Sequence, residues 1–194
     1  MIRRWWVVGV LALALGFVVA GLVGQLSDRG RAKVFVIGDS ITVMARGPDP
    51  WPDGWEVDAV IGRTTPQGIA VAHGTDLGDQ SVVIVALGTN DHSDSAAAFG
   101  AKIDQMIEAI GPGPTVIWVN VDAQSSTLAD AGPGVNAALT AATARHVNLR
   151  VADWNQYVQT LAGTPGMGAG DGVHYGLNGS SLRRAWMLGL LGPG

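Results

Sequence analysis

Five short apolar runs of β-forming residues recur along the chain, and segments with helical spacing lie between them. The runs occupy residues 34–37, 56–61, 81–87, 115–119 and 148–152. Each run is continuous enough to be buried on both faces, as the strands of a parallel sheet are. Because right-handed crossovers place helices on both faces of such a sheet, the pattern predicts a doubly wound α/β/α sandwich with a five-stranded parallel sheet.

The segments with helical spacing are residues 95–110, 135–146 and 180–191. At the first of them, we expect Asp94 to cap the start of the helix and Gly111-Pro112 to end it. The last has one apolar stripe, made by Leu182, Trp186 and Leu190. The proline-rich and tryptophan-rich stretch 47–55 predicts a rigid loop, which either covers the core, the reading we favour, or forms a lip of the site.

The first two dozen residues differ from the rest of the chain. Residues 5–24 carry no charge and, as a helix of about 30 Å, are long enough to cross a bilayer. Arg3 and Arg4 precede them, which favours a signal anchor with the remainder of the chain outside the cytoplasm. We therefore predict an anchor and stalk over residues 1–32 and one domain over residues 33–194, with secretion after cleavage near residues 18–20 as the alternative.

Composition excludes several classes of function. The 194 residues contain no cysteine, so the chain has neither disulfides nor a thiol nucleophile, nor a cysteine-bound metal. The formal net charge of −4 argues against nucleic acid as a partner. The histidines and acidic residues also lack metal-ligand spacing, and we expect no metal and no cofactor.

Short polar motifs follow the predicted strands, at the edge of the sheet where open α/β folds build their sites. They are Gly38-Asp39-Ser40 after the first run, Gly62 after the second, Gly88-Thr89-Asn90-Asp91 after the third and Asp171-Gly172-Val173-His174 beyond the fifth. Although the motifs are far apart in the sequence, a parallel sheet brings them to one edge. We therefore expect them to form one site, with Ser40 as the nucleophile.

The side chains in these motifs suit acyl transfer. A neutral imidazole at His174 could take the proton of Ser40, and Asp171 is close enough in sequence to orient that imidazole. The backbone N–H groups of Ser40 and Gly62 and the side-chain amide of Asn90 could stabilise an oxyanion. The sequence thus predicts a Ser40-His174-Asp171 triad and an oxyanion hole made by Ser40, Gly62 and Asn90.

Other polar residues receive structural interpretations. We expect Asp39 to hydrogen-bond within the loop of the nucleophile and Asp153 to cap or pack beside Trp154. Arg63 is interpreted as a surface or ion-pair residue, with contact to an anionic substrate as the alternative. Of the other histidines, His92 is expected to face solvent or lie behind the site, and His73 and His146 to lie on the surfaces of helices.

Together, the four motifs resemble those of the SGNH/GDSL hydrolase superfamily over residues 33–191. This resemblance implies a flavodoxin-like sandwich, a Ser-His-Asp triad and a Ser/Gly/Asn oxyanion hole, with hydrolysis of esters or thioesters or removal of O-acetyl groups, without metal or organic cofactor. Softer matches at 119–121, 136–139 and 151–154 are similar to the SGNH domains attached to membrane acyltransferases that acylate envelope glycans. The multi-span acyltransferase portion of those proteins has no counterpart here.

The sequence therefore predicts a membrane-anchored, extracytoplasmic serine esterase or deacylase, whose substrate is a small-molecule, glycan or lipid ester. Two alternatives stay open. One is an O-acyltransferase, which differs from the esterase only in its acceptor and would work with a separate membrane acyltransferase. The other is a catalytically silent domain that binds an envelope glycan or such a partner.

Overall fold

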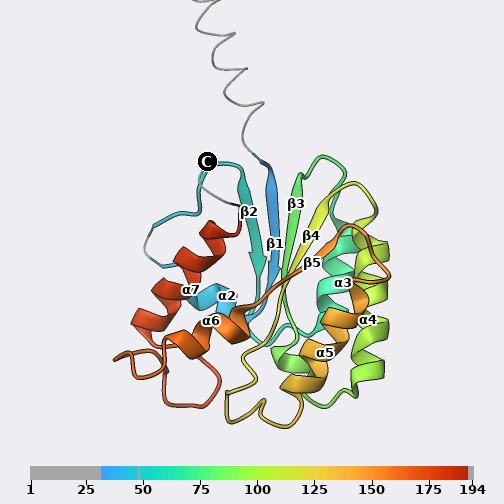
Figure 1. Ribbon diagram of the computed structural model, residues 1–194. Coiled ribbons are helices and arrows are strands. Elements are labelled where there is room, and N and C mark those ends of the chain that lie inside the picture. The colour runs from blue at the N-terminus through green and yellow to red at the C-terminus, as the bar shows by residue number, and fades with distance from the viewer. Residues whose placement is uncertain (1–31, 48, 192–194) are drawn as a thin grey trace, which may run out of the picture. The chain divides into compact units, whose positions relative to one another are not determined.

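The five predicted strands form one parallel sheet, in the order β2-β1-β3-β4-β5 (Figure 1). The computed structural model describes residues 32–47 and 49–191. The strands are β1 (Val34–Gly38), β2 (Trp55–Ala59), β3 (Val82–Ala86), β4 (Thr115–Val119) and β5 (Leu149–Ala152). The predicted five-stranded parallel sheet is therefore confirmed. Its strand order is that of flavodoxin-like sheets.

The inner and outer strands differ in burial. All residues of β1 are buried, whereas β2 and β5 lie at the edges and keep partly exposed positions. The expectation that all five runs are buried on both faces is therefore wrong for the two edge strands. Strand β2 also ends at Ala59, before Val60 and Ile61, whose side chains are exposed. The chain leaves the sheet there and enters the loop that carries Gly62.

Three helices cover one face of the sheet, on the right in Figure 1. They are α3 (Thr65–Gly74), α4 (Ala96–Ile110) and α5 (Gly132–Ala142). The predicted cap of α4 is wrong by one residue, because the hydroxyl of Ser95 accepts the Ala98 N–H at 3.2 Å and Asp94 pairs with Lys102 instead. Helix α5 begins earlier than predicted, with a proline in its first turn, and ends before His146.

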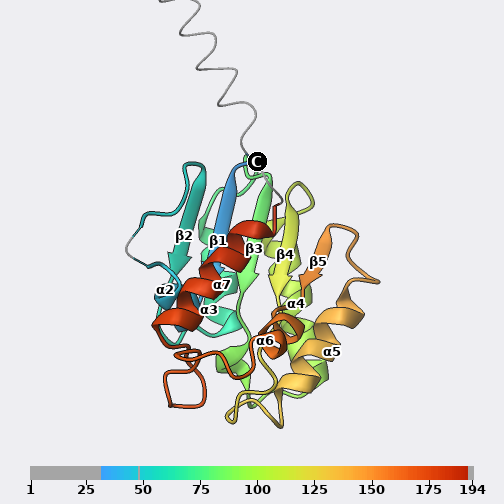
Figure 2. The ribbon, with the colours of Figure 1, turned by 60° about the vertical axis from the view of Figure 1, so that its left-hand side comes forward.

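The opposite face carries α2 (Ser40–Met44), α6 (Trp154–Thr160) and α7 (Leu177–Gly189), and α7 crosses in front of the central strands in Figure 2. Helix α7 starts three residues before the predicted position. Its buried positions are Gly179, Ser180, Arg183 and Met187. The predicted apolar stripe is therefore not the buried face of the helix. Trp186 and Leu190 are only partly buried, and a charged residue, Arg183, lies on the buried face.

Successive residues of each central strand point into two separate apolar layers. Beneath α3, α4 and α5 lie Ile37, Val85 and Trp118, and beneath α7 lie Val36 and Ile84. The indole N–H of Trp118 donates to the Leu87 carbonyl at 3.0 Å, which satisfies the polar atom of a fully buried ring. Packing on both faces fixes the strand ends, and therefore the loops that extend from them.

The tryptophan-rich loop before β2 packs against the core. Trp51 and Trp55 stack with ring centroids 5.6 Å apart, and both rings pack against the layer beneath α7. The Arg184 guanidinium lies 4.4 Å from the Trp51 ring centroid and donates to the carbonyls of Arg46 and Pro50. These contacts agree with the expectation that the loop covers the core.

The predicted membrane span at residues 5–24 lies outside the described residues. Within residues 32–47 and 49–191, no helix is long and apolar enough to cross a membrane.

Candidate active site

The loop between β1 and α2 presents Ser40 at the carboxyl edge of the sheet. Ser40 is the first residue of α2, and Asp39 is its N-cap, whose carboxylate accepts the Ile41 N–H at 3.0 Å. The turn is tight, because a Cβ on Gly38 would lie 2.4 Å from the side chain of Thr42. Glycine at position 38 therefore lets the strand pass into the helix at this point.

The predicted serine, histidine and aspartate lie within hydrogen-bond distance of one another. His174 Nε2 is 2.9 Å from the Ser40 hydroxyl, and His174 Nδ1 is 2.7 Å from Asp171 Oδ2. Asp171 Oδ1 also accepts the N–H groups of His174, at 2.8 Å, and of Val173, at 3.0 Å. These backbone bonds, together with the imidazole, hold the pKa of Asp171 well below its ordinary value.

The residue after His174 fixes the position of this loop. The Tyr175 hydroxyl accepts the Trp154 indole N–H at 2.6 Å and donates to Asp122 at 3.1 Å. Burial raises the pKa of Tyr175, so its hydroxyl remains a neutral donor. Sequence reasoning assigned Tyr175 no role, because Trp154 and Asp122 lie far from it in the chain.

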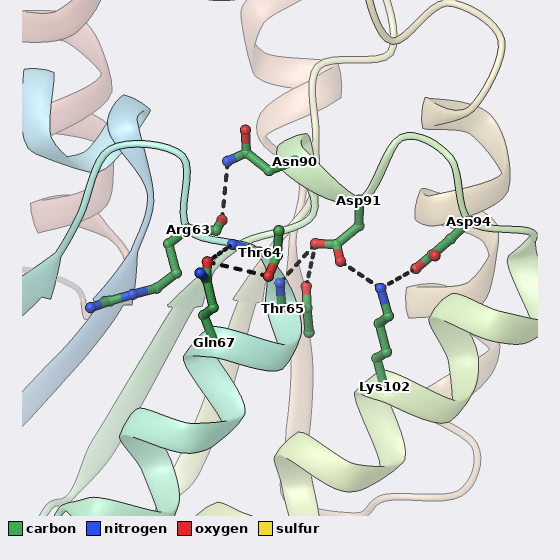
Figure 3. A network of polar contacts seen from close by, with 8 residues as sticks. All are labelled: Arg63, Thr64, Thr65, Gln67, Asn90, Asp91, Asp94 and Lys102. Carbon is green, nitrogen blue, oxygen red and sulfur yellow. Dashed lines mark hydrogen bonds and ion pairs between the residues drawn. The ribbon is translucent and has the colours of Figure 1, made fainter.

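Gly62 and Asn90 lie on neighbouring loops at the same edge of the sheet. Gly62 has a φ of +75°, a conformation that favours glycine, and the space where a Cβ would stand is open. The Asn90 side-chain amide donates to the Arg63 carbonyl at 3.0 Å (Figure 3). Because an amide has two N–H donors, this bond orients the group and uses only one of them.

A buried polar network fixes these two loops relative to each other, as Figure 3 shows. The Asp91 carboxylate accepts the backbone N–H of Thr65 at 2.9 Å and its hydroxyl at 2.7 Å, so it binds the first turn of α3. Its other oxygen pairs with Lys102 of α4 at 2.7 Å, and Lys102 also pairs with Asp94 at 2.6 Å. Asp91 therefore connects the turn η1 (Thr89–Asp91), which carries Asn90, to two helices.

Arg63 is a structural residue. Its side chain is buried and donates to the carbonyl of Asp58 at 2.6 Å and to that of Gly38 at 3.3 Å. It also pairs with the Asp58 carboxylate at 2.7 Å. These contacts bear out the ion-pair interpretation and connect the Gly62 loop to the end of β1.

The remaining predicted residues lie as follows. Asp153 caps α6 by accepting the Gln156 N–H at 2.9 Å, as expected. His146 lies beyond α5 and contacts Asp104 at 2.6 Å, whereas His73 and His92 are exposed.

The Asp91–Lys102 pair gives a prediction for stability. Lys102→Met leaves the Asp91 carboxylate, whose side chain is only 1% exposed, without its cation. Breaking such a buried pair costs about 3 kcal/mol of unfolding free energy, the lower end of the usual range, because Lys102 itself is partly exposed. Urea denaturation measures this loss. Arg145→Met, which removes a half-exposed pair with Asp104, is the matched control and should cost less than about 1 kcal/mol; equal losses in the two variants would contradict the prediction.

The chain matches no protein-family model and no curated protein. It does match solved structures. The C-terminal catalytic domain of Streptococcus pneumoniae peptidoglycan O-acetyltransferase A superposes with a TM-score of 0.63 at 19% identity, over 81% of this chain and 90% of that one. A G-D-S-L family lipolytic protein from Veillonella parvula has the same TM-score at 20% identity, over 81% and 96%. The SGNH-hydrolase family esterase AlinE4 has a TM-score of 0.55 at 17% identity, over 85% and 99%.

These likenesses, together with the strand order, define the class of fold. The chain has the SGNH/GDSL hydrolase fold, as its four motifs predict.

Proposed function

We propose that the chain is a serine esterase or deacylase that works through an acyl-enzyme on Ser40. The observation that carries the proposal is the continuous contact from Ser40 through His174 to Asp171, at 2.9 and 2.7 Å. A hydroxyl, an imidazole and a carboxylate in this order are the components of a serine nucleophile with its base. Similar folds that include esterases support the same reaction class.

In the proposed reaction, Ser40 Oγ attacks the ester carbonyl while His174 Nε2 takes the hydroxyl proton. Asp171 holds the proton on Nδ1 and stabilises the imidazolium that forms. The N–H groups of Ser40 and Gly62 and the amide of Asn90 bind the developing oxyanion. His174 then protonates the leaving alcohol, and water repeats the sequence to release the acid and restore Ser40.

The experiment that tests this function is hydrolysis of p-nitrophenyl acetate by the purified chain, followed by labelling with a fluorophosphonate probe. An active serine esterase releases p-nitrophenolate and carries the label on Ser40, located by peptide mass analysis. A catalytically silent binding domain would show neither result.

Replacement of Asn90 tests the oxyanion hole. Asn90→Ala removes one preorganised donor and is expected to lower kcat for p-nitrophenyl acetate by roughly 100-fold to 1000-fold, with a smaller change in KM. Asn178→Ala is the control, because Asn178 lies exposed at the start of α7, where its amide donates to the Pro165 carbonyl at 2.9 Å. A loss of less than about 5-fold in Asn90→Ala would remove Asn90 from the oxyanion hole.

A cavity of about 520 Å³ beside His174 supports an O-acylated carbohydrate as the substrate. Polar uncharged side chains, two carboxylates and three apolar side chains contribute to its lining, which includes no lysine or arginine among the described residues. They are Gln124, Ser125 and Ser126; Asp122 and Asp171; and Val158, Met167 and Val173. Because His174 protonates the leaving alcohol, a cavity on its side suits the alcohol part of the ester. Hydroxyl and amide groups suit a neutral polyol, and the carboxylates disfavour an anionic one.

Acyl transfer to a sugar hydroxyl uses the same site with a different acceptor. The likeness to a peptidoglycan O-acetyltransferase domain supports this second candidate. Incubation with an acetylated methyl glycoside and a non-acetylated sugar distinguishes the two, because hydrolysis releases acetate and transfer yields a newly acetylated sugar. Ser126→Ala should lower kcat/KM for the glycoside and leave p-nitrophenyl acetate unaffected.

We also propose that residues 5–24 anchor the chain in the cell membrane, with residues 33–194 outside the cytoplasm. The uncharged length of this segment and the preceding Arg3 and Arg4 support the proposal. Resistance to extraction by alkaline carbonate, together with digestion of the domain by protease added outside intact cells, is the expected result. Release of the chain by carbonate would overturn the anchor, and recovery of a shortened chain in the medium would instead indicate cleavage.

A further inference from the structure

Arg183 places a positive charge in the interior of the domain. It lies on the buried face of α7 and is only 4% exposed. Its guanidinium lies 4.5 Å from the ring centroid of Trp154 and 5.4 Å from that of Trp186. No hydrogen-bond partner for its Nε and Nη1 atoms is found among the described residues. Because burying a charge is costly, the two indole rings and any nearby anions have to offset this one.

Two carboxylates and the neutral Tyr175 hydroxyl, from three parts of the chain, lie near Arg183. A small buried cavity is lined by Arg183 together with Asp39 from the end of β1, Asp122 from the loop after β4, and Tyr175 from the loop of His174. Burial lowers the pKa of Arg183 to about 10, so the guanidinium stays protonated at neutral pH. Of the two carboxylates, Asp39 is the more buried and is adjacent to Ser40.

The Asp39 carboxylate acts as an acceptor for several donors. It accepts the Ile41 N–H at 3.0 Å and also interacts with the Thr42 N–H and the Thr89 hydroxyl. Thr89 is the neighbour of Asn90, so Asp39 connects the loop of the nucleophile to the loop of the oxyanion amide. The ionised carboxylate can accept from all of these donors. A protonated carboxyl would place its own O–H among them and so lose part of its capacity to accept.

Burial by itself favours protonation of Asp39. It raises the pKa of Asp39 from 3.8 to about 6, against the opposing effects of the Ile41 N–H and of Arg183. A carboxyl with this pKa is ionised at neutral pH by a narrow margin. The positive charge of Arg183 is among the effects that lower the pKa of Asp39, so its loss raises that pKa further toward neutral pH.

We propose that Arg183 is a positioning residue for the acyl-transfer site. Its buried guanidinium keeps Asp39 ionised, and the ionised Asp39 holds the loops that carry Ser40 and Asn90 in fixed positions relative to each other. The catalytic part of this inference rests on the proposed function, but the charge state of Asp39 does not. Stability and catalysis therefore test the two parts separately.

The first test is the pH dependence of urea unfolding for the wild type and Arg183→Met. The pKa of Asp39 is raised in the folded chain, so the folded state binds a proton at Asp39 more tightly than the unfolded state does. The stabilisation that results is fully present below about pH 4 and is lost as the pH rises to about 6. Without Arg183 the pKa of Asp39 is higher, so this stabilisation continues to be lost above pH 6. The urea midpoint of Arg183→Met should therefore fall further below that of the wild type between pH 6 and 8. The double variant with Asp39→Asn should lose this extra pH dependence, whereas the double variant with Asp122→Asn should keep it.

The second test is the pH profile of kcat/KM for p-nitrophenyl acetate. The acid limb of Arg183→Met should be displaced to higher pH than that of the wild type. Adding Asp39→Asn should abolish this displacement, because no carboxyl is left to titrate. Arg183→Lys should keep the wild-type limb. Arg184→Met, which removes the neighbouring arginine on the outer side of α7, is the matched control and should leave the profile unchanged.

The outcomes separate the two claims. A deficit in stability and rate that is equal at every pH would mean that Arg183 only packs against Trp154, and would overturn the proposal. If Arg183→Met does not fold, Arg183→Lys decides, since a packing role predicts a rate that is lowered equally at every pH and the proposal predicts the wild-type rate as well as the wild-type acid limb. A wild type without esterase activity contradicts the proposed function, while the urea series still decides the charge state of Asp39.

Discussion

Ser40→Ala is expected to lower kcat for p-nitrophenyl acetate by about 10⁴-fold or more and to abolish fluorophosphonate labelling. The variant keeps the backbone N–H at position 40 and so removes only the hydroxyl that contacts His174 at 2.9 Å. Spectrophotometric release of p-nitrophenolate measures the loss. The melting temperature should change little, because a single small hydroxyl is removed.

A second serine provides the matched control. Ser181 is exposed on α7, where its hydroxyl donates to the Leu177 carbonyl at 2.9 Å. Ser181→Ala should retain wild-type turnover. If Ser40→Ala retained activity and label, Ser40 would not be the nucleophile, and the proposed reaction would be wrong.

Asp171→Asn is the second large effect, with an expected loss of about 10⁴-fold in kcat. The carboxylate accepts the Nδ1–H of His174 and so keeps Nε2 free to take the proton of Ser40. An amide can hold the ring by the other tautomer, in which Nε2 carries the hydrogen. Because its backbone and imidazole donors keep the pKa of Asp171 far below the usual range, activity should not fall in acid through protonation of Asp171 itself.

The chain contains a second carboxylate–imidazole pair at a similar distance, made through Nε2 of His146 rather than through Nδ1. Asp104 and His146 approach at 2.6 Å, compared with 2.7 Å for Asp171 and His174, and the two carboxylate side chains are 46% and 51% exposed. Asp104→Asn should leave turnover unchanged, because no serine is bonded to that imidazole among the described residues. Similar losses in the two variants would indicate a general effect of the substitution rather than a role for Asp171 in orienting the base.

Much of the fold follows from local patterns. The apolar runs correspond to strands within one to two residues, and the spacing of Phe99, Ile103 and Ile107 identifies α4. Short or weakly patterned helices are harder to recognise. Helix α3 has glycine and alanine at many positions and no strong apolar stripe, but its N-cap Thr64 forms a capping box with Gln67 of the first turn, and Pro66 lies in the same turn. Those residues were the available signal for this helix.

Some residues of the candidate site can likewise be recognised from the sequence, and others cannot. Ser40, His174 and Asp171 are recognisable because each belongs to a short motif with a chemical purpose. The structural roles of Asp91, Lys102 and Arg183 are not recognisable in this way, even though Asp91 belongs to one of the motifs, because their partners come from other elements. Arg183 even occupies a position where helical spacing would favour an apolar residue, since α7 buries it against Trp154.

The sequence by itself determined the order of the five strands along the chain, the helices α4, α5 and α7, and the residues with the chemistry for acyl transfer, because hydrophobic periodicity and strand-end motifs are local properties. Only the tertiary structure decided that Ser40 meets His174, 134 positions away, and which buried charges surround the nucleophile. Such contacts depend on parallel pairing and on packing between distant segments. Neither the distances nor the desolvation of Asp39 and Arg183 exists until both faces of the sheet are covered.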